Sequence, residues 1–303
     1  MPKLMTPYAQ KLAKSSKKAK QYEKTGPWIE AWRRLRRNRM AIAGLIILLI
    51  LIVCAICPQL LTPYGPDEQN YSEAFQFPNL RHPFGTDNLG RDILARIIYG
   101  ARVSLVIGLI SVSLSLVIGG LLGAAAAFYG GKTDNVIMRV MDILIALPSF
   151  LLAIAIAAAL GPGLMNVIFA IAFGGIPNYA RVTRAAILTV KDLEYVEAAR
   201  AIGAADRRIV FRHMIPNALA PIIVQATLGV AGAIISAAGL SFIGLGVQPP
   251  TPEWGSMLSS GKQYIRTNWN IVTFPGLTIM LTVFALNLLG DGLRDALDPK
   301  LKR

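Results

Sequence analysis

Charged residues are scarce in this sequence. Asp, Glu, Lys and Arg make up only 16% of its 303 residues, whereas hydrophobic residues make up 54%. An ordinary soluble domain of this length carries about a quarter charged residues. The composition therefore excludes that class and indicates a chain that lies largely in lipid.

Histidine and cysteine are scarcer still, with two residues of each. His82 and His213 fall on opposite sides of the membrane in the topology that the apolar runs predict, which excludes a histidine-based metal or catalytic cluster. Cys54 and Cys57 could form a redox or metal pair, or could simply pack on one helix face, and the absence of a second ligand pair favours packing. No Ser/His/acid triad is supported. We therefore expect no catalytic residue, no metal site and no cofactor in this chain.

The sequence contains several long runs of apolar residues without charge. A bilayer core about 30 Å thick needs roughly 20 apolar residues for each helical span. Gly161-Pro162-Gly163 divides one longer run into two. The sequence thus predicts an all-α polytopic membrane protein with six transmembrane helices, at 40–61, 103–128, 136–160, 164–180, 217–239 and 271–289. The tail of the fifth run, 240–250, is expected to fold at the outer surface.

The distribution of Lys and Arg sets the orientation, because these residues resist translocation. Most of the 31 fall in segments that lie on one side if the N-terminus is cytoplasmic. We therefore expect a basic cytoplasmic tail (1–39), a first helix that stays as an anchor (40–61), an extracytoplasmic segment (62–101) and a cytoplasmic C-terminus (292–303). The net charge of +14 then needs no nucleic acid to explain it. Whether the tail also touches anionic membrane lipid stays open.

Residues 85–92 read G-x-x-x-x-G-R-D, close to the phosphate-binding pattern G-x-x-x-x-G-K-[ST]. The segment lacks the lysine and the hydroxyl that binds Mg²⁺, and it is predicted to lie on the outer side of the membrane. We therefore expect any ATP and Mg²⁺ to be held by other chains.

The long polar segment 181–213 separates the fourth and fifth spans. Asp192 can cap a helix over 193–202, and Gly203 suits the left-handed residue that ends it. A second helix is expected over 205–212, before Pro216 begins the fifth span. The segment places small residues beside charged ones, which is typical of a docking element. A solvated amphipathic loop on the membrane would have the same profile. The small and charged residues are Glu197, Ala198, Ala199, Arg200, Ala201, Arg207 and Arg208.

Glu197-Ala198-Ala199, with Gly203 and then Ile215-Pro216, resembles the EAA motif of ABC-importer permeases. The family pattern ends Ile-x-Leu-Pro, whereas this chain has Ile at position 215. The resemblance implies a type I ABC importer permease fold in which this loop is a coupling helix, seated in a groove of a cytoplasmic ATPase subunit. The residues it assigns to coupling are Glu197, Ala198, Ala199, Arg200, Gly203, Ile215 and Pro216.

Further stretches resemble the second permease subunit of dipeptide and oligopeptide importers; they are 82–87 with 90–92, 100–105, 240–250, 291–295 and 298–299. The resemblance implies a transmembrane domain over 102–291 that contains the coupling loop 181–213. It also implies a heterodimer with a homologous permease, two ATP-binding subunits, an extracytoplasmic peptide-binding protein, and a bacterial or archaeal cytoplasmic membrane. Nickel chelates, glutathione or antimicrobial peptides are alternative substrates. A proton-driven carrier or a membrane scaffold would be a different class.

Some residues within the spans carry separate expectations. Gly119 and Gly123 in the second span, and the small residues Gly229 and Gly232 in the fifth, are expected either to meet a partner permease and line the translocation path or to pack the chain's own helices.

Asp142 is the best intramembrane acid, and we expect it to pair locally with Arg139 or to lie at the interface, and not to relay protons. Pro148 and Pro177 can kink their helices and so act as hinges.

Overall fold

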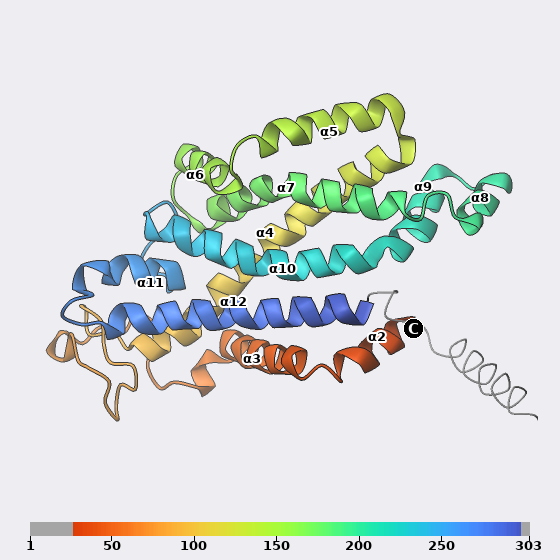
Figure 1. Ribbon diagram of the computed structural model, residues 1–303. Helices are drawn as coiled ribbons and strands as arrows, with labels where there is room; N and C mark the ends of the chain where they lie inside the picture. The colour runs from red at the N-terminus through yellow and green to blue at the C-terminus, as the bar shows by residue number, and fades with distance from the viewer. Residues whose placement is uncertain (1–26, 298–303) are drawn as a thin grey trace, which may run out of the picture.

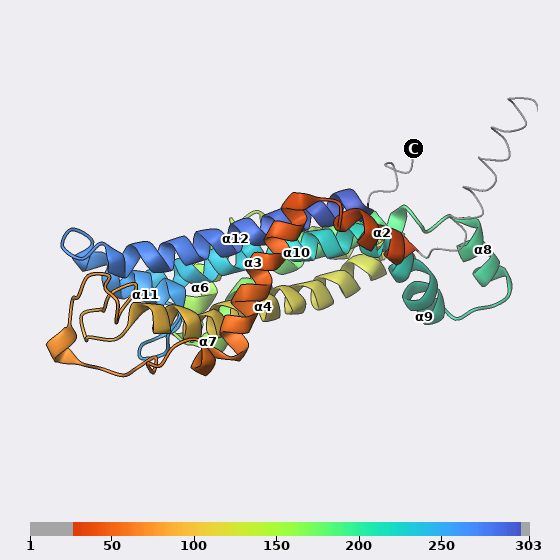
Figure 2. The same ribbon diagram turned by 90° about the horizontal axis from the view of Figure 1, so that it is seen from below.

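The computed structural model describes residues 27–297, with side chains from residue 29 onward. Most of the predicted basic tail and the last residues of the predicted C-terminal segment lie outside this range. The described chain is an elongated bundle of helices running roughly side by side (Figures 1 and 2). Between residues 27 and 297 it contains no β-strand, apart from an isolated bridge between Thr86 and Asp92.

Six long or paired helical elements build the bundle. They are α3 (Arg39–Ile56), α4 (Ile93–Tyr129), α5 (Gly131–Ile145) with α6 (Ser149–Leu160), α7 (Leu164–Leu188), α10 (Ile215–Phe242) and α12 (Asn270–Leu297). Shorter helices are α2 (Pro27–Leu35), α8 (Glu194–Ala201), α9 (Asp206–Arg208) and α11 (Trp254–Gly261), with 3-10 turns at Pro58–Leu60, Tyr71–Glu73 and Lys262–Tyr264. A π-helical turn, Ile209–Met214, joins α9 to α10.

Among the described residues, four helices are long and apolar enough to cross a membrane: α3, α4, α12 and the continuous helix Asp206–Phe242. The pair α5 and α6 would make a fifth span. Helix α7 coincides with the fourth predicted span but carries Asn166, Asn178 and Arg181 and does not meet the same criterion. Length and composition thus support four or five of the six predicted spans.

The third predicted span, 136–160, is not one straight helix. Helices α5 and α6 are bent by 82° relative to each other. Pro148 stands at the break and is the N-cap of α6. A proline disfavours the helical conformation in the residue before it and has no N–H to donate, so Leu147-Pro148 ends one helix and begins the next.

Helix α4 begins at Ile93, before the predicted start at 103, and so takes up part of the predicted extracytoplasmic segment. Its extra turns are capped by Asp92, whose carboxylate accepts a hydrogen bond of 2.6 Å from the Ala95 N–H. Helix α12 likewise runs past the predicted end at 289 to Leu297.

Gly119 and Gly123 set the distance between α4 and α7. A Cβ at Gly119 would meet the Ile176 carbonyl oxygen, and one at Gly123 would meet the Ala180 carbonyl oxygen. Only hydrogen at these positions lets the two backbones approach this closely. The finding favours the expectation that both glycines pack the chain's own helices.

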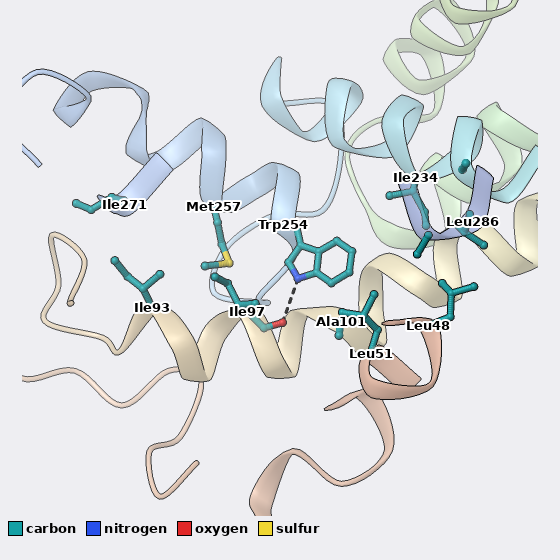
Figure 3. Close-up of a cluster of buried hydrophobic side chains, with 12 residues drawn as sticks. Leu48, Leu51, Ile93, Ile97, Ala101, Ile234, Trp254, Met257, Ile271 and Leu286 are labelled. Atoms are coloured by element: carbon teal, nitrogen blue, oxygen red, sulfur yellow. Dashed lines mark hydrogen bonds between the residues drawn. The ribbon is translucent and has the colours of Figure 1, made fainter. Parts of the chain in front are cut away.

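Trp254 anchors the end of the bundle that carries the 57–92 segment. Figure 3 shows its indole Nε1 donating a hydrogen bond of 3.0 Å to the Ile97 carbonyl oxygen of α4. Leu48 and Leu51 of α3, Ile234 of α10 and Leu286 of α12 belong to the same buried cluster. This packing joins α11 to α3, α4, α10 and α12 at one end of the bundle.

Candidate functional site

The segment that carries the EAA-like residues projects from the bundle at the end opposite to α11 and the 57–92 loops (Figures 1 and 2). We call it the α8 hairpin, residues 189–214. Helix α8 ends at Ala201, and Gly203, which follows its C-cap residue, has a left-handed φ of +76° as the sequence predicts. The predicted Asp192 cap is wrong, because Leu193 occupies the N-cap position without a side-chain hydrogen bond.

The second arm of the α8 hairpin also differs from the predicted helix over 205–212. Helix α9 passes through the π-helical turn directly into α10, in which Pro216 lies within the first turn. Because the helix continues from α9, the missing N–H of Pro216 leaves one hydrogen bond of the continuous helix unmade. The π-helical turn accommodates the missing hydrogen bond without a break.

The α8 hairpin has a buried face that fixes it to the bundle. Val196 and Ala199 are buried with Ile209 and Met214 of the second arm and with Ile187 of α7. Ala199 is therefore a core residue, although the sequence groups it with the docking residues. Ile215 packs against the same cluster.

The opposite face of α8 is open. Glu197, Ala198, Gly203 and Pro216 are exposed. The exposed Arg200 is held over the Phe128 ring of α4, with its guanidinium carbon 5.6 Å from the ring centroid.

Ile202 belongs to this face and was not singled out from the sequence. It is 85% exposed at the tip of the α8 hairpin. Its spacing of four residues from Ala198 places both on one helical face, which is the signal that could have identified it. The result is a small apolar tip flanked by charge.

A cavity of about 600 Å³ lies among α4, the α5–α6 turn, α7 and α10. Its lining includes Ser115, Pro148, Tyr179, Gly229 and Gly232. Both α10 glycines line this cavity, and that the cavity belongs to the translocation path stays a prediction. The buried Tyr179 hydroxyl has no hydrogen-bond partner among the described residues.

Two ion pairs join α5 to α7. Asp142 pairs with Arg181, at 2.7 Å between Oδ1 and Nη2, so the predicted partner Arg139 is wrong. Asp134 accepts two hydrogen bonds from Arg184, at 2.6 Å from Nε and 2.5 Å from Nη2. Residue spacing along α5 suggests Arg139 as a neighbour, but the antiparallel packing of α7 brings Arg181 closer.

The G-x-x-x-x-G-R-D segment is held by its own ion pairs and does not form a phosphate-binding loop. Its Asp87 pairs with Arg91, and Asp92 accepts from His82 Nδ1 at 2.8 Å. A Cβ at Gly90 would meet the Asn70 carbonyl oxygen, so the loop backbone is already covered by protein. The acidic side chains are occupied in holding this segment together.

Comparison with known proteins gives matches over nearly the whole chain. A family model described as binding-protein-dependent transport system inner membrane component matches residues 115–303. A second, described as the N-terminal TM domain of oligopeptide transport permease C, matches residues 26–80.

Curated relatives align over almost their full length. The chain is 51% identical to the di/tripeptide transport system permease protein DppC of Pseudomonas aeruginosa, over 91% of this chain and 93% of that protein. It is 50% identical to the dipeptide transport system permease protein DppC of Alkalihalophilus pseudofirmus, over 93% of each. It is 48% identical to the glutathione transport system permease protein GsiD of Escherichia coli, over 91% of each.

Solved structures show a similar fold. The inward-facing MetNI methionine ABC transporter matches with a TM-score of 0.56 at 21% identity, over 68% of this chain and 98% of that one. An amino acid ABC transporter solved with histidines matches with a TM-score of 0.53 at 15% identity, over 67% and 94% of the two chains. At these identities the likeness concerns the fold alone.

Proposed function

This chain belongs to the family of binding-protein-dependent transport system inner membrane components, and on that premise we propose that it moves di- and oligopeptides across the cytoplasmic membrane. It has the type I ABC importer permease fold and is a multi-pass membrane subunit, not an enzyme in its own right. The observation that carries the substrate proposal is 51% identity, over 91% of the chain, to a di/tripeptide permease.

Membership of this family implies an ATPase partner and a binding protein. We further propose a heterodimer with a homologous permease, two ATP-binding subunits that hold ATP and Mg²⁺, and an extracytoplasmic peptide-binding protein. The proposed orientation places both termini in the cytoplasm of a bacterial or archaeal cell. The excess of Lys and Arg at the α8 hairpin end supports this orientation.

We propose that the α8 hairpin is the element that the ATPase subunit grips. Its exposed face offers Glu197 and Ala198 beside the protruding Ile202, which suits a groove with an apolar floor and a charged rim. Its buried face is fixed through Val196 and Ala199 to α7 and α10. A movement imposed on α8 would thus be passed to two of the helices that line the cavity.

Glutathione is the second candidate substrate, because the chain is 48% identical to a glutathione permease. Both candidates are peptides with charged termini, so the permease fold alone does not separate them. Choice between them is expected to lie mainly in the external binding protein.

The test is uptake by the complete importer in proteoliposomes, with the ATPase inside and the binding protein outside. We expect ATP-dependent uptake of a radiolabelled dipeptide that exceeds uptake of glutathione. Faster glutathione uptake would support the second candidate. Uptake driven by a proton gradient without ATP, or purification of the permease without any ATPase, would refute the importer assignment.

A further inference from the structure

The pair Asp142–Arg181 is unusual because both charges are half exposed, at 52% and 47% of their side chains, within the α5 and α7 helices. The neighbouring pair Asp134–Arg184 joins the same two helices but is more covered, at 19% and 34%, and is made by two hydrogen bonds. The two pairs thus have the same helices in common and differ in geometry and exposure.

Stability does not explain the exposed pair. Single-bond ion pairs at this exposure contribute roughly 0–1 kcal/mol, and the Asp134–Arg184 pair already ties α5 to α7. Charged side chains within membrane helices face a water-filled cavity or other protein and not lipid, because contact with hydrocarbon is costly. Arg181 meets this condition, since it lines the 600 Å³ cavity.

The cavity has the size and lining of a site for a small peptide. Its volume of about 600 Å³ lies within the usual range for small-molecule sites, roughly 300–1,000 Å³. Apolar groups such as Leu144 and Ile171 line it together with Asn178 and Tyr179. This mixture suits a ligand with a fixed polar backbone and varied side chains.

Arg181 has donors to spare at the cavity wall. The structure gives it one hydrogen bond, from Nη2 to Asp142 Oδ1, whereas a guanidinium can donate two parallel hydrogen bonds to a carboxylate. A zwitterionic peptide carries one carboxylate and one ammonium group. It can therefore replace each member of the ion pair with a partner of the same charge, and no charge is left unpaired.

We propose that Arg181, which lines the cavity, takes the carboxylate of a bound peptide, and that Asp142, its ion-pair partner outside the cavity lining, takes the ammonium group. The inference rests on the proposed function, since it names residues that touch the peptide during transport. The closed Asp142–Arg181 pair is then the resting state that the peptide opens.

The test compares Arg181→Gln with Arg184→Gln in the complete importer, reconstituted with its ATPase, partner permease and binding protein. The measured quantities are dipeptide molecules imported per ATP hydrolysed and the melting temperature of the assembly. Arg181→Gln should lower the import ratio about tenfold, because hydrogen bonds to charged groups contribute on that scale, and should leave the melting temperature nearly unchanged. Arg184→Gln should lower the melting temperature and leave the import ratio nearly unchanged.

A double variant separates contact from structure. Asp142→Arg with Arg181→Asp restores an ion pair between the helices but presents each peptide terminus with the wrong charge, so import should stay low. Rescue by this swap, or a wild-type ratio in Arg181→Gln, would overturn the proposal. If Arg181→Gln fails to assemble, Asp142→Asn decides, and an unchanged ratio there refutes the contact. Failure of the wild-type assembly to import dipeptide would instead refute the proposed function.

Discussion

Gly123 and Gly232 show how the same residue type can have different tasks in one bundle. At Gly123 a Cβ would meet the Ala180 carbonyl oxygen and crowd the Arg184 backbone nitrogen, both in α7. At Gly232, in α10, a Cβ would meet nothing within 4 Å, and the residue lines the cavity. The first glycine is required by packing, whereas the second only leaves space.

Gly123→Ala should therefore destabilise the chain. Backbone atoms of α7 cannot rotate away as a flexible side chain can, so α4 and α7 must separate, at a cost of about 1–3 kcal/mol. The measurement is the melting temperature of the purified subunit in detergent. Gly232→Ala is the matched control and should melt at or slightly above the wild type, because alanine favours a helix interior over glycine by about 1 kcal/mol; equal effects at the two positions would contradict this account.

Glu253 is a buried acid with a structural task. It is only 1% exposed and caps α11 by accepting hydrogen bonds from the Gly255 and Ser256 N–H groups, at 2.8 and 2.7 Å. Burial raises the pKa of the Glu253 carboxyl above its ordinary value of 4.5, although these hydrogen bonds act in the opposite direction.

This pKa shift predicts a pH dependence of stability. A folded-state pKa above 4.5 means that folding favours the protonated carboxyl, so the stabilisation is present below pH 4.5 and is lost as the pH rises through the higher folded value. The melting temperature of the wild type relative to Glu253→Gln should therefore fall as the pH rises from 4.5. The glutamine amide does not titrate in this range, so the difference in melting temperature between the two proteins cancels the contributions of all other titratable groups. A difference that is flat, or that grows with pH, would show that the pKa is not raised.

Helix α8 and its turn are the element on which we propose that coupling depends. Gly203 has a φ of +76°, and a Cβ there would meet nothing within 4 Å. A side chain at this position would therefore meet no steric clash, and its only cost would be the left-handed backbone conformation. The turn sets how Ile202 is presented, because the two residues are adjacent.

Gly203→Ala should weaken docking while leaving the subunit in the membrane. A left-handed backbone costs a non-glycine residue roughly 1–2 kcal/mol, and asparagine tolerates it better. We expect less copurified ATPase and lower dipeptide uptake for Gly203→Ala, and milder losses for Gly203→Asn. Wild-type uptake in the alanine variant would argue against α8 as the docking element.

Local sequence signals predicted the positions of α8, its glycine end and most long helices, because apolar length and a left-handed glycine act within a few residues. The Asp192 cap, the Arg139 partner and the separate 205–212 helix were wrong. In each case the outcome depends on packing between distant segments: the burial of Val196 against the second arm, the approach of α7 to Asp142, and the continuity of the π-helical turn with α10. Gly229 and Gly232 were expected to line a path or to pack, but the other walls of the cavity were not predicted, since they come from separated segments of the chain.

The whole molecule has two unlike ends. One end carries α11 and the ion-paired 57–92 segment, and the other carries the α8 hairpin (Figure 2). The exposed arginines Arg200, Arg207, Arg208 and Arg212 gather at the hairpin end. Because Lys and Arg are retained on the cytoplasmic side, this asymmetry predicts that the α8 hairpin lies inside the cell.

Site-specific labelling tests that orientation directly. In a background with Cys54→Ala and Cys57→Ala, single cysteines replace Leu80 and Asp206, which are both exposed and lie in the two opposite end segments. A membrane-impermeant maleimide added to intact spheroplasts should label Leu80→Cys at once and Asp206→Cys only after permeabilisation. Because the ATPase of the proposed importer works in the cytosol, labelling of Asp206→Cys from outside would place α8 beyond its reach, and the proposed route from ATP to the cavity would fail with it.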